Sequence, residues 1–363
     1  MIDLALIWHI VYGLLGCIGL IFVVALIFNI RGRMEAVRQQ SLLKLVKKEF
    51  ENYLISTAEN EGLRKQSVRR YQHGRFSLQL YSDSRKDIFL GHLIQLTREL
   101  KGEFTDTLLN LYEDLGLSDY SIAKINSPLI SRKIRGVQEV GDLHYKKVHG
   151  LVLKYTGVKN QALREEVTVA AANLSVLNPL AFLERLTYDL SDWVQLRLHS
   201  ILNNSDFKHT LAFNEWMGHH LPSVRAFMVK MVVLFKRIDQ MEHVIPLAKD
   251  PNEVVRKSVF EAIEHLGDDS HFEILLSGLL TEPKLEMKIA ALRAIAATET
   301  EIKAEVLLKL LQEFSGSGPL KFEVVRTLYS IHNDSENLIF NHFSGSVPAD
   351  IELMSRHIVS DLP

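Results

Sequence analysis

The sequence has a single cysteine, Cys17, among 363 residues. A disulfide within this chain and a cysteine-based zinc site are therefore excluded. Glycine and proline are scarce, at 19 and 9 residues, and no low-complexity run occurs, which argues against long disordered stretches. An excess of one charge is lacking too, because the formal net charge is only -2, so the composition gives no argument for nucleic-acid binding. What remains is 47% hydrophobic, which is enough for a large core.

A helical pattern recurs along the C-terminal two thirds of the chain. It is clearest in KDPNEVVRKSVFEAIEHLG, from Lys249 to Gly267, where Arg256 is followed by apolar residues three or four and then seven positions later. Basic residues in the same setting recur 28 to 35 positions apart, and they are Lys133, Arg164, Arg197, Arg225, Arg256, Lys288, Lys321 and, less completely, Arg356. The stretch at Arg197 fits worst, because its seventh position is the polar Asn204. A period of this length indicates an array of small helical units.

Turn-forming residues precede most of these positions. They are Pro128, Ser191 with Asp192, Pro222, Asp250 with Pro251, Glu282 with Pro283, and Gly318 with Pro319. Proline ends the preceding helix and is tolerated in the first turn of the next one, so each cluster predicts a break between two helices. We therefore expect an all-α fold built from helical hairpins.

The best of these breaks resembles a known family. Asp250-Pro251, with Arg256 six residues after the aspartate, is similar to the motif of HEAT repeats, and Glu282 with Lys288 has the same spacing. The resemblance implies an α-solenoid over residues 119–363, with a structural ladder of acidic and basic side chains between adjacent hairpins. The ladder is expected to be interrupted where the acidic position is Ser127, Val158, Ser191, His219 or Ser315.

The N-terminal segment is of a different kind. From Leu4 to Ile30 it has 27 residues without Asp, Glu, Lys or Arg, whereas a membrane-spanning helix needs about 20. A signal peptide is the alternative, but that begins with basic residues, and here Asp3 precedes the apolar run and Arg31 follows it. We expect a single transmembrane anchor in residues 1–33.

The charges around this segment predict its orientation. Basic residues follow the apolar run and none precedes it, which places the N-terminus outside and the rest of the chain in the cytoplasm of a single-pass inner-membrane protein. Within the apolar run, Gly13, Gly16 and Cys17 form a small-residue surface on which another membrane helix could pack, although glycine is common in membrane helices in any case.

Residues 34–118 are predicted to be a basic, helical juxtamembrane region with capping hairpins next to the solenoid. Its basic residues are predicted to contact lipid headgroups or a partner, with a solvated face as the equal alternative. They are Arg64, Lys65, Arg69, Arg70 and Arg75.

Sequence motifs for chemistry are lacking. The fifteen histidines form no recognised ligand set, and neither Gly-x-Ser-x-Gly nor His-Glu-x-x-His occurs. We therefore predict no catalytic, cofactor-binding or metal site. Trp193 and Trp216 lie close to breaks between helices and are candidates for docking a partner, with core packing as the alternative.

Arrays of helical hairpins expose long surfaces that bind proteins more often than they catalyse. The sequence thus predicts a membrane-anchored, non-catalytic adaptor with no cofactor, which holds a protein partner at the membrane, touches membrane lipid and does not bind nucleic acid. By family-level analogy it resembles accessory subunits of bacterial inner-membrane envelope complexes, such as exopolysaccharide glycosyltransferase systems. The alternatives are a HEAT-like enzyme, by similarity to tetrapyrrole-handling lyases or DNA glycosylases, and a sensor of anionic lipid. The oligomeric state is not predicted.

Overall fold

The computed structural model describes residues 20–27, 29–31, 33–34, 44, 82–99, 103–204, 210–298, 304–314, 316–332 and 334–361. These residues are helical or lie in turns and connections, and no strand occurs among them. The chain divides into two compact units, Met1–Leu153 and Lys154–Pro363, which we describe separately. The predicted domain limits at residues 33 and 118 stay predictions, and α5 (Leu117–Ile125) runs across the second of them.

The predicted membrane anchor is corrected by the structure. No helix in the described residues is both long and apolar enough to cross a membrane. Residues 4–19 lie outside the described part of the chain. The single-pass membrane location predicted from this segment is therefore withdrawn.

The first unit is built from antiparallel neighbours. Its described helices are α3 (Asp83–Glu99), α4 (Glu103–Asp114), α5, α6 (Ile130–Asp142), the 3-10 turn η2 (Lys146–Val148) and α7 (His149–Leu153). Gly116, with φ of 67°, makes the left-handed turn between α4 and α5. Gly136 lets α5 and α6 approach closely, because a Cβ there would lie 2.8 Å from backbone atoms of Ser121 and Ile125.

The second unit is a succession of longer helices joined by short ones. Its longer helices are α8 (Gln161–Leu174), α9 (Asp192–Asn203), α10 (Pro222–Leu234), α12 (Glu253–Leu266), α13 (Phe272–Thr281), α14 (Leu285–Ala297), α15 (Ala304–Glu313), α16 (Gly318–Ile331), α17 (Ser335–His342) and α18 (Ala349–Asp361). Between them lie η3 (Ala181–Arg185), η4 (Phe213–Trp216), η5 (Ile238–Gln240), α11 (Met241–Val244), η6 (Ile245–Lys249) and η7 (Asp269–His271).

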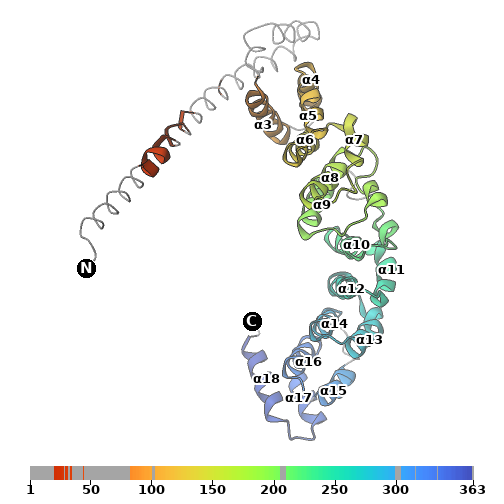
Figure 1. Cartoon of the computed structure of the whole chain (residues 1–363). Coiled ribbons are helices and arrows are strands. Elements are labelled where there is room, and N and C mark those ends of the chain that lie inside the picture. The colour runs from red at the N-terminus through yellow and green to blue at the C-terminus, as the bar shows by residue number, and fades with distance from the viewer. Residues whose placement is uncertain are drawn as a thin grey trace, which may run out of the picture. The chain divides into compact units, whose positions relative to one another are not determined.

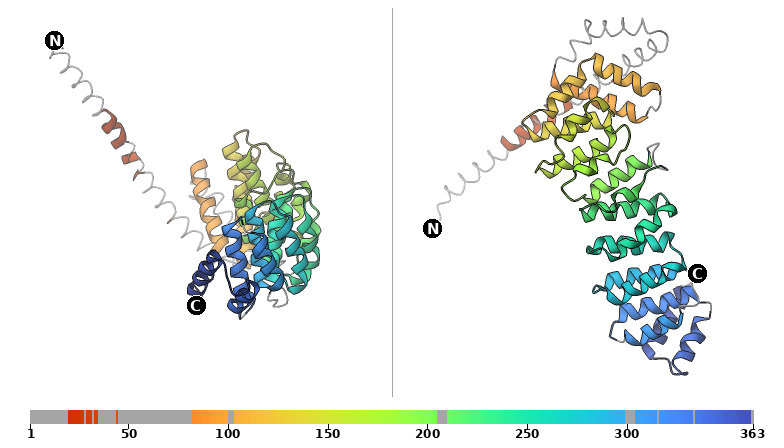
Figure 2. Two further views of the ribbon diagram at one scale, coloured as in Figure 1. Left: turned by 90° about the horizontal axis from the view of Figure 1, so that it is seen from below. Right: turned by 90° about the vertical axis from the view of Figure 1, so that its right-hand side faces the viewer.

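Alternate helices of the second unit pack against one another. α10 contacts α12, α12 contacts α14, α14 contacts α16 and α16 contacts α18. In Figure 1, α10, α12, α14 and α16 form one row, and α11, α13 and α15 form a second row beside it. The right-hand view of Figure 2 shows the green to blue helices following one another in chain order. We call α8, α9, α10, α12, α14 and α16 the register helices, because they carry the recurring motif.

The register helices begin where the sequence predicts breaks. Ser191 caps α9, its Oγ accepting the N–H of Val194 at 3.4 Å, and Asn252 caps α12 through the N–H of Val254 at 3.0 Å. α10 begins at Pro222, and α16 also has a proline in its first turn. A proline in the first turn has no N–H that would need an intrahelical partner, so these starts follow from local chemistry.

The predicted core positions of most register helices are buried. Three and seven residues after Arg164, Arg225, Arg256, Lys288 and Lys321, every side chain is 1% exposed or less. These core residues are Val167, Ala171, Met228, Val232, Val259, Ile263, Ala291, Ile295, Val324 and Leu328. The recurring motif therefore reflects one repeated way of burying a helix face.

In α9 the residue predicted to lead the motif, Arg197, lies two positions away from the residue that does so in the structure. Its buried residues are Val194, Leu198 and Leu202, which lie one before, three after and seven after Gln195. Gln195, not Arg197, therefore occupies the position that Arg225 and its equivalents hold in the other helices. We call Arg164, Gln195, Arg225, Arg256, Lys288 and Lys321 the register residues.

α18 also departs from the prediction at Arg356. Val359, three residues after this arginine, is half exposed, whereas the buried residues of the helix are Ile351 and Ile358. The motif at Arg356 is therefore out of phase with the core, and we do not count α18 among the register helices.

Candidate interaction surface

Two consecutive register residues bind acidic side chains of the next helix start. Arg225 donates from Nε and Nη2 to the carboxylate of Asp250, at 2.7 and 2.9 Å. Arg256 does the same with Glu282, through Nε and through Nη2 at 2.8 Å. The hydrogen bond and the charge of Glu282 raise the pKa of Arg256 further above its ordinary value. Both acidic side chains are almost fully buried, so these bidentate pairs tie α10 to α12 and α12 to α14.

Four of the register residues also hold the loop that precedes their own helix. Nη1 of Arg256 donates to the carbonyl oxygens five and six residues earlier, at 3.1 and 2.8 Å. Arg225 makes the same two bonds, and so does Arg164. Gln195 makes the equivalent bond to the carbonyl of Leu190, at 3.1 Å. A side chain that satisfies otherwise unpaired carbonyls and a buried carboxylate has a structural role.

Arg164 and Lys288 make cation–π contacts in place of such ion pairs. The guanidinium of Arg164 lies 3.8 Å from the ring centroid of Tyr188, and Nζ of Lys288 lies 5.5 Å from that of Phe314. Lys288 therefore does not continue the line of ion pairs. Lys321 donates to Asp350 at 2.6 Å. The ladder thus consists of ion pairs and cation–π contacts.

Arg197, the residue displaced from the register, points elsewhere. Its Nη1 donates to Glu166 of α8 at 2.7 Å.

The acidic position ahead of Arg225 is taken by His219. Its Nδ1 accepts the N–H of Leu221 at 3.1 Å, and its Nε2 lies 3.1 Å from the carbonyl oxygen of Leu183 and donates to it. Burial lowers the pKa of His219, which keeps the ring neutral in this arrangement.

Part of the surface of the register helices is exposed to solvent. Residues one and five positions after a register residue lie on the same side of a helix, and all of them except the buried Val169 and Ala226 are exposed or partly exposed. We call them the register face, and they include Leu196, Lys257, Glu261, Ile289, Arg293, Phe322 and Arg326. Lys257 and Glu261 form an ion pair at 3.8 Å within α12.

Of the two tryptophans predicted to dock a partner, only Trp193 is well exposed. Trp193 is 56% exposed in the first turn of α9, and Leu196 on the register face of the same helix is 62% exposed. Trp216 lies in η4 and is partly buried, with its ring 6.4 Å from that of His219. Its Nε1 is buried and makes no hydrogen bond among the described residues. Trp216 therefore serves packing, and Trp193 can serve contact.

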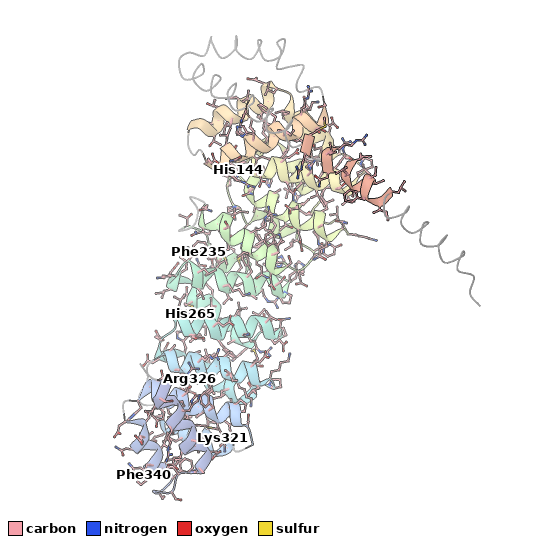
Figure 3. All side chains as sticks on the ribbon, turned by 90° about the vertical axis from the view of Figure 1, so that its left-hand side faces the viewer. His144, Phe235, His265, Lys321, Arg326 and Phe340 are labelled. Atoms are coloured by element: carbon pink, nitrogen blue, oxygen red, sulfur yellow. The ribbon has the colours of Figure 1, made fainter. Side chains whose placement is uncertain are left out.

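A basic part of the register face lies on α14 and α16. Nε of Arg293 donates to Oε1 of Glu323 at 3.2 Å, and Nη1 of Arg326 lies 3.8 Å from Oε2 of the same carboxylate. The side chain of Glu323 is 9% exposed, whereas those of Arg293 and Arg326 are 55% and 59% exposed. Figure 3 labels Arg326 together with Lys321 on α16. Arg293, Glu323 and Arg326 were not predicted as a site, although the sequence does show a basic residue five positions after both Lys288 and Lys321.

The first unit holds a separate buried polar cluster. Lys124 of α5 is 4% exposed, and its Nζ donates to Oδ1 of Asp87 at 2.6 Å and to Oε1 of Glu139. The second oxygen of Glu139 accepts the hydroxyl of Ser121 at 2.7 Å. Burial raises the pKa of Glu139. Burial also acts to raise the pKa of Asp87, but the hydrogen bond and the charge of Lys124 outweigh it, and the pKa of Asp87 lies below its ordinary value. One ammonium thus holds two carboxylates, of which Asp87 is the more exposed, so the cluster ties α3, α5 and α6 together.

Several predicted contact residues lie outside the described residues. They are Gly13, Gly16, Cys17, Arg64, Lys65, Arg69, Arg70 and Arg75. The membrane-packing role of the first three belonged to the withdrawn anchor. The lipid or partner contact of the basic residues stays a prediction.

In the part of the chain that the structure covers, no group of three or more His, Cys, Asp or Glu side chains is arranged to hold a metal ion. No family model matches the sequence, and no curated protein matches it. Among solved structures, the chain is similar to the crystal structure of an engineered protein, with 14% identity over 67% of this chain and 95% of that one. The TM-score is 0.26, so this likeness carries no argument about the fold or the function.

Proposed function

We propose that the protein is a non-catalytic scaffold of HEAT-like helical hairpins that binds a protein partner on its register face. The observation that carries this proposal is the exposed pair Trp193 and Leu196 on α9. Large aromatic side chains dominate the energy of protein interfaces when a partner covers them, and exposed apolar side chains that lie together mark interaction sites more than scattered ones do.

The arrangement of the ladder supports the same proposal. The side chains of Arg225, Arg256 and their acidic partners make contacts between neighbouring helices, so they hold in place the helices that carry the register face. Stacked helical units of this kind present extended surfaces that suit protein recognition. The resemblance of Asp250 and Arg256 to the HEAT motif agrees with this use.

Site-specific photo-crosslinking tests the proposal in cells that make the full chain. A photoreactive amino acid replaces Leu196 in one variant and Phe340 in a control variant, because Phe340 of α17 is also large and 51% exposed but lies on a helix outside the register set. We expect one defined protein to be crosslinked at position 196 and not at position 340.

The mutation Trp193→Ala should then weaken this crosslinked complex. Loss of a central aromatic contact costs about 2 kcal/mol or more, which corresponds to roughly 30-fold in affinity. Equal crosslinking at both positions, or a complex that Trp193→Ala leaves unchanged, would contradict the proposal.

A further inference from the structure

The basic part of the register face carries more positive charge than the fold uses. Among the residues that the structure describes, Glu323 is the one acidic side chain that pairs with Arg293 and Arg326, so two guanidinium groups share a single carboxylate. Glu323 is buried beneath them, whereas both arginines are more than half exposed. The three side chains together carry one net positive charge, which lies at the surface.

The hydrogen-bond donors of this pair are also largely unused. Arg293 donates Nε to Glu323, and no other hydrogen bond of its guanidinium occurs among the described residues. Arg326 lies 3.8 Å from Glu323, beyond hydrogen-bond distance. A guanidinium has five N–H donors in a fixed fork, and its best partner is a carboxylate that accepts two of them.

The two helices that carry the arginines are held side by side. α14 packs against α16, and Oγ1 of Thr327 donates to the carbonyl of Leu292 at 3.4 Å, one residue away from each arginine. One helical turn earlier, at the equivalent positions, lie Ile289 and Phe322, both half-buried. The surface therefore combines a fixed pair of cationic forks with an apolar border.

We propose that this part of the register face, Arg293 and Arg326 over Glu323, docks an acidic segment of a protein partner through its Asp or Glu carboxylates. The inference rests on the proposed function, since it names the chemistry of the partner for one part of the face. Charge complementarity selects this occupant: the patch is cationic, while the whole chain, at a net charge of -2, gives no general attraction for nucleic acid.

Fluorescence anisotropy with the purified full chain tests the proposal. The probe is a short fluorescein-labelled polyglutamate peptide, compared with a polyglutamine peptide of the same length and with a single-stranded oligonucleotide. We expect polyglutamate to bind, polyglutamine not to bind, and added salt to weaken the complex, because exposed charges are screened over about 8 Å at physiological ionic strength.

Three variants should change the affinity for polyglutamate in different ways. The double variant R293Q/R326Q should lose about tenfold in affinity, the scale of two exposed ion pairs. Glu323→Gln should gain about three- to fivefold, because it frees both guanidiniums from their internal counter-ion. The double variant R98Q/R132Q removes two equally exposed arginines that each have their own acidic partner, and it should leave binding unchanged.

Several results would overturn the proposal. They are equal binding of polyglutamate and polyglutamine, an equal loss in R98Q/R132Q, and tighter binding of the oligonucleotide through the same two arginines. If R293Q/R326Q fails to fold, Glu323→Gln decides alone: a gain supports the docking site and no change refutes it. Polyglutamate binding without a specific crosslink at position 196 would mean that the proposed function fails while this site stands, so the two failures are distinguishable.

Discussion

The substitution Arg256→Met should destabilise the second unit by an amount that the structure lets us work out. It removes a bidentate partner from Glu282, whose side chain is 6% exposed, and it removes two hydrogen bonds to loop carbonyls. Breaking a buried ion pair from one side costs 3–5 kcal/mol, because a charge is left buried and unpaired. Since Arg256 is 19% exposed and water can reach part of the site, we expect the lower end, about 3 kcal/mol.

This destabilisation can be measured by thermal unfolding and by hydrogen exchange. A loss of 3 kcal/mol in a unit of this size corresponds to a decrease of roughly 6–12 °C in Tm. Hydrogen–deuterium exchange followed by mass spectrometry should show faster exchange in peptides from α12 to α14 than in α16, because the lost contact joins α12 to the start of α14.

Two further variants separate the buried charge from other causes. The double variant R256M/E282L replaces the pair by apolar side chains and should lie within about 1–2 kcal/mol of the parent protein. Lys284→Met breaks a solvent-exposed pair with Glu253, 2.7 Å long and joining the same two helices, and should cost less than about 1 kcal/mol. If R256M and R256M/E282L are equally destabilised, or if Lys284→Met costs as much, the reasoning about the buried carboxylate is refuted.

Other predictions follow from single contacts. Gly136→Ala should lower the Tm of the first unit, because its methyl group would lie 2.8 Å from the α5 backbone, whereas Gly91→Ala on α3, with open space around it, should not. Gly278→Ala should also destabilise, but by less, because its methyl group meets the ring of Phe260 at 2.5 Å and a side chain can shift more easily than a backbone. Burial lowers the pKa of His219 below its ordinary value of 6.5 in the folded state. The unfolded state therefore binds more protons than the folded state just below pH 6.5. The free energy of unfolding should decrease as the pH falls from 6.5 toward the pKa of His219 in the folded protein. The variant His219→Asn keeps an acceptor near the N–H of Leu221. In this variant the midpoint of urea unfolding should depend less on pH between 6.5 and the lower pKa of His219. An unchanged pH dependence would contradict the role given to His219.

Much of the helical order was readable from the sequence because it depends on local chemistry. Pro222 starts α10 because its ring fixes the backbone, the side chain of Asn252 caps α12, and the buried three- and seven-residue positions after Arg256 follow from helical periodicity. Gln195 was not predicted because the recurring motif has a basic residue at this position, whereas the fold needs only a side chain that can donate to a loop carbonyl.

The parts that could not be read depend on contacts between helices. Nothing in the sequence shows that the guanidinium of Arg164 finds the ring of Tyr188 in place of an acid. The sharing of Glu323 by two arginines is equally invisible, because Arg293 lies two helices earlier in the chain, on α14. The membrane prediction depended on hydropathy alone, and among the described residues no helix is both long and apolar enough to cross a membrane.

The uneven composition of the ladder has a mechanical consequence for the second unit. Tension along the row of register helices would be carried by bidentate ion pairs at α10–α12 and α12–α14, but at α14–α16 by the contact between Lys288 and Phe314 and by exposed Arg293. We expect the last of these joints to yield first, since an exposed pair resists separation less than a buried one. An acidic ligand that binds both Arg293 and Arg326 would link α14 to α16. Binding there would therefore stiffen the weakest of these three contacts between register helices.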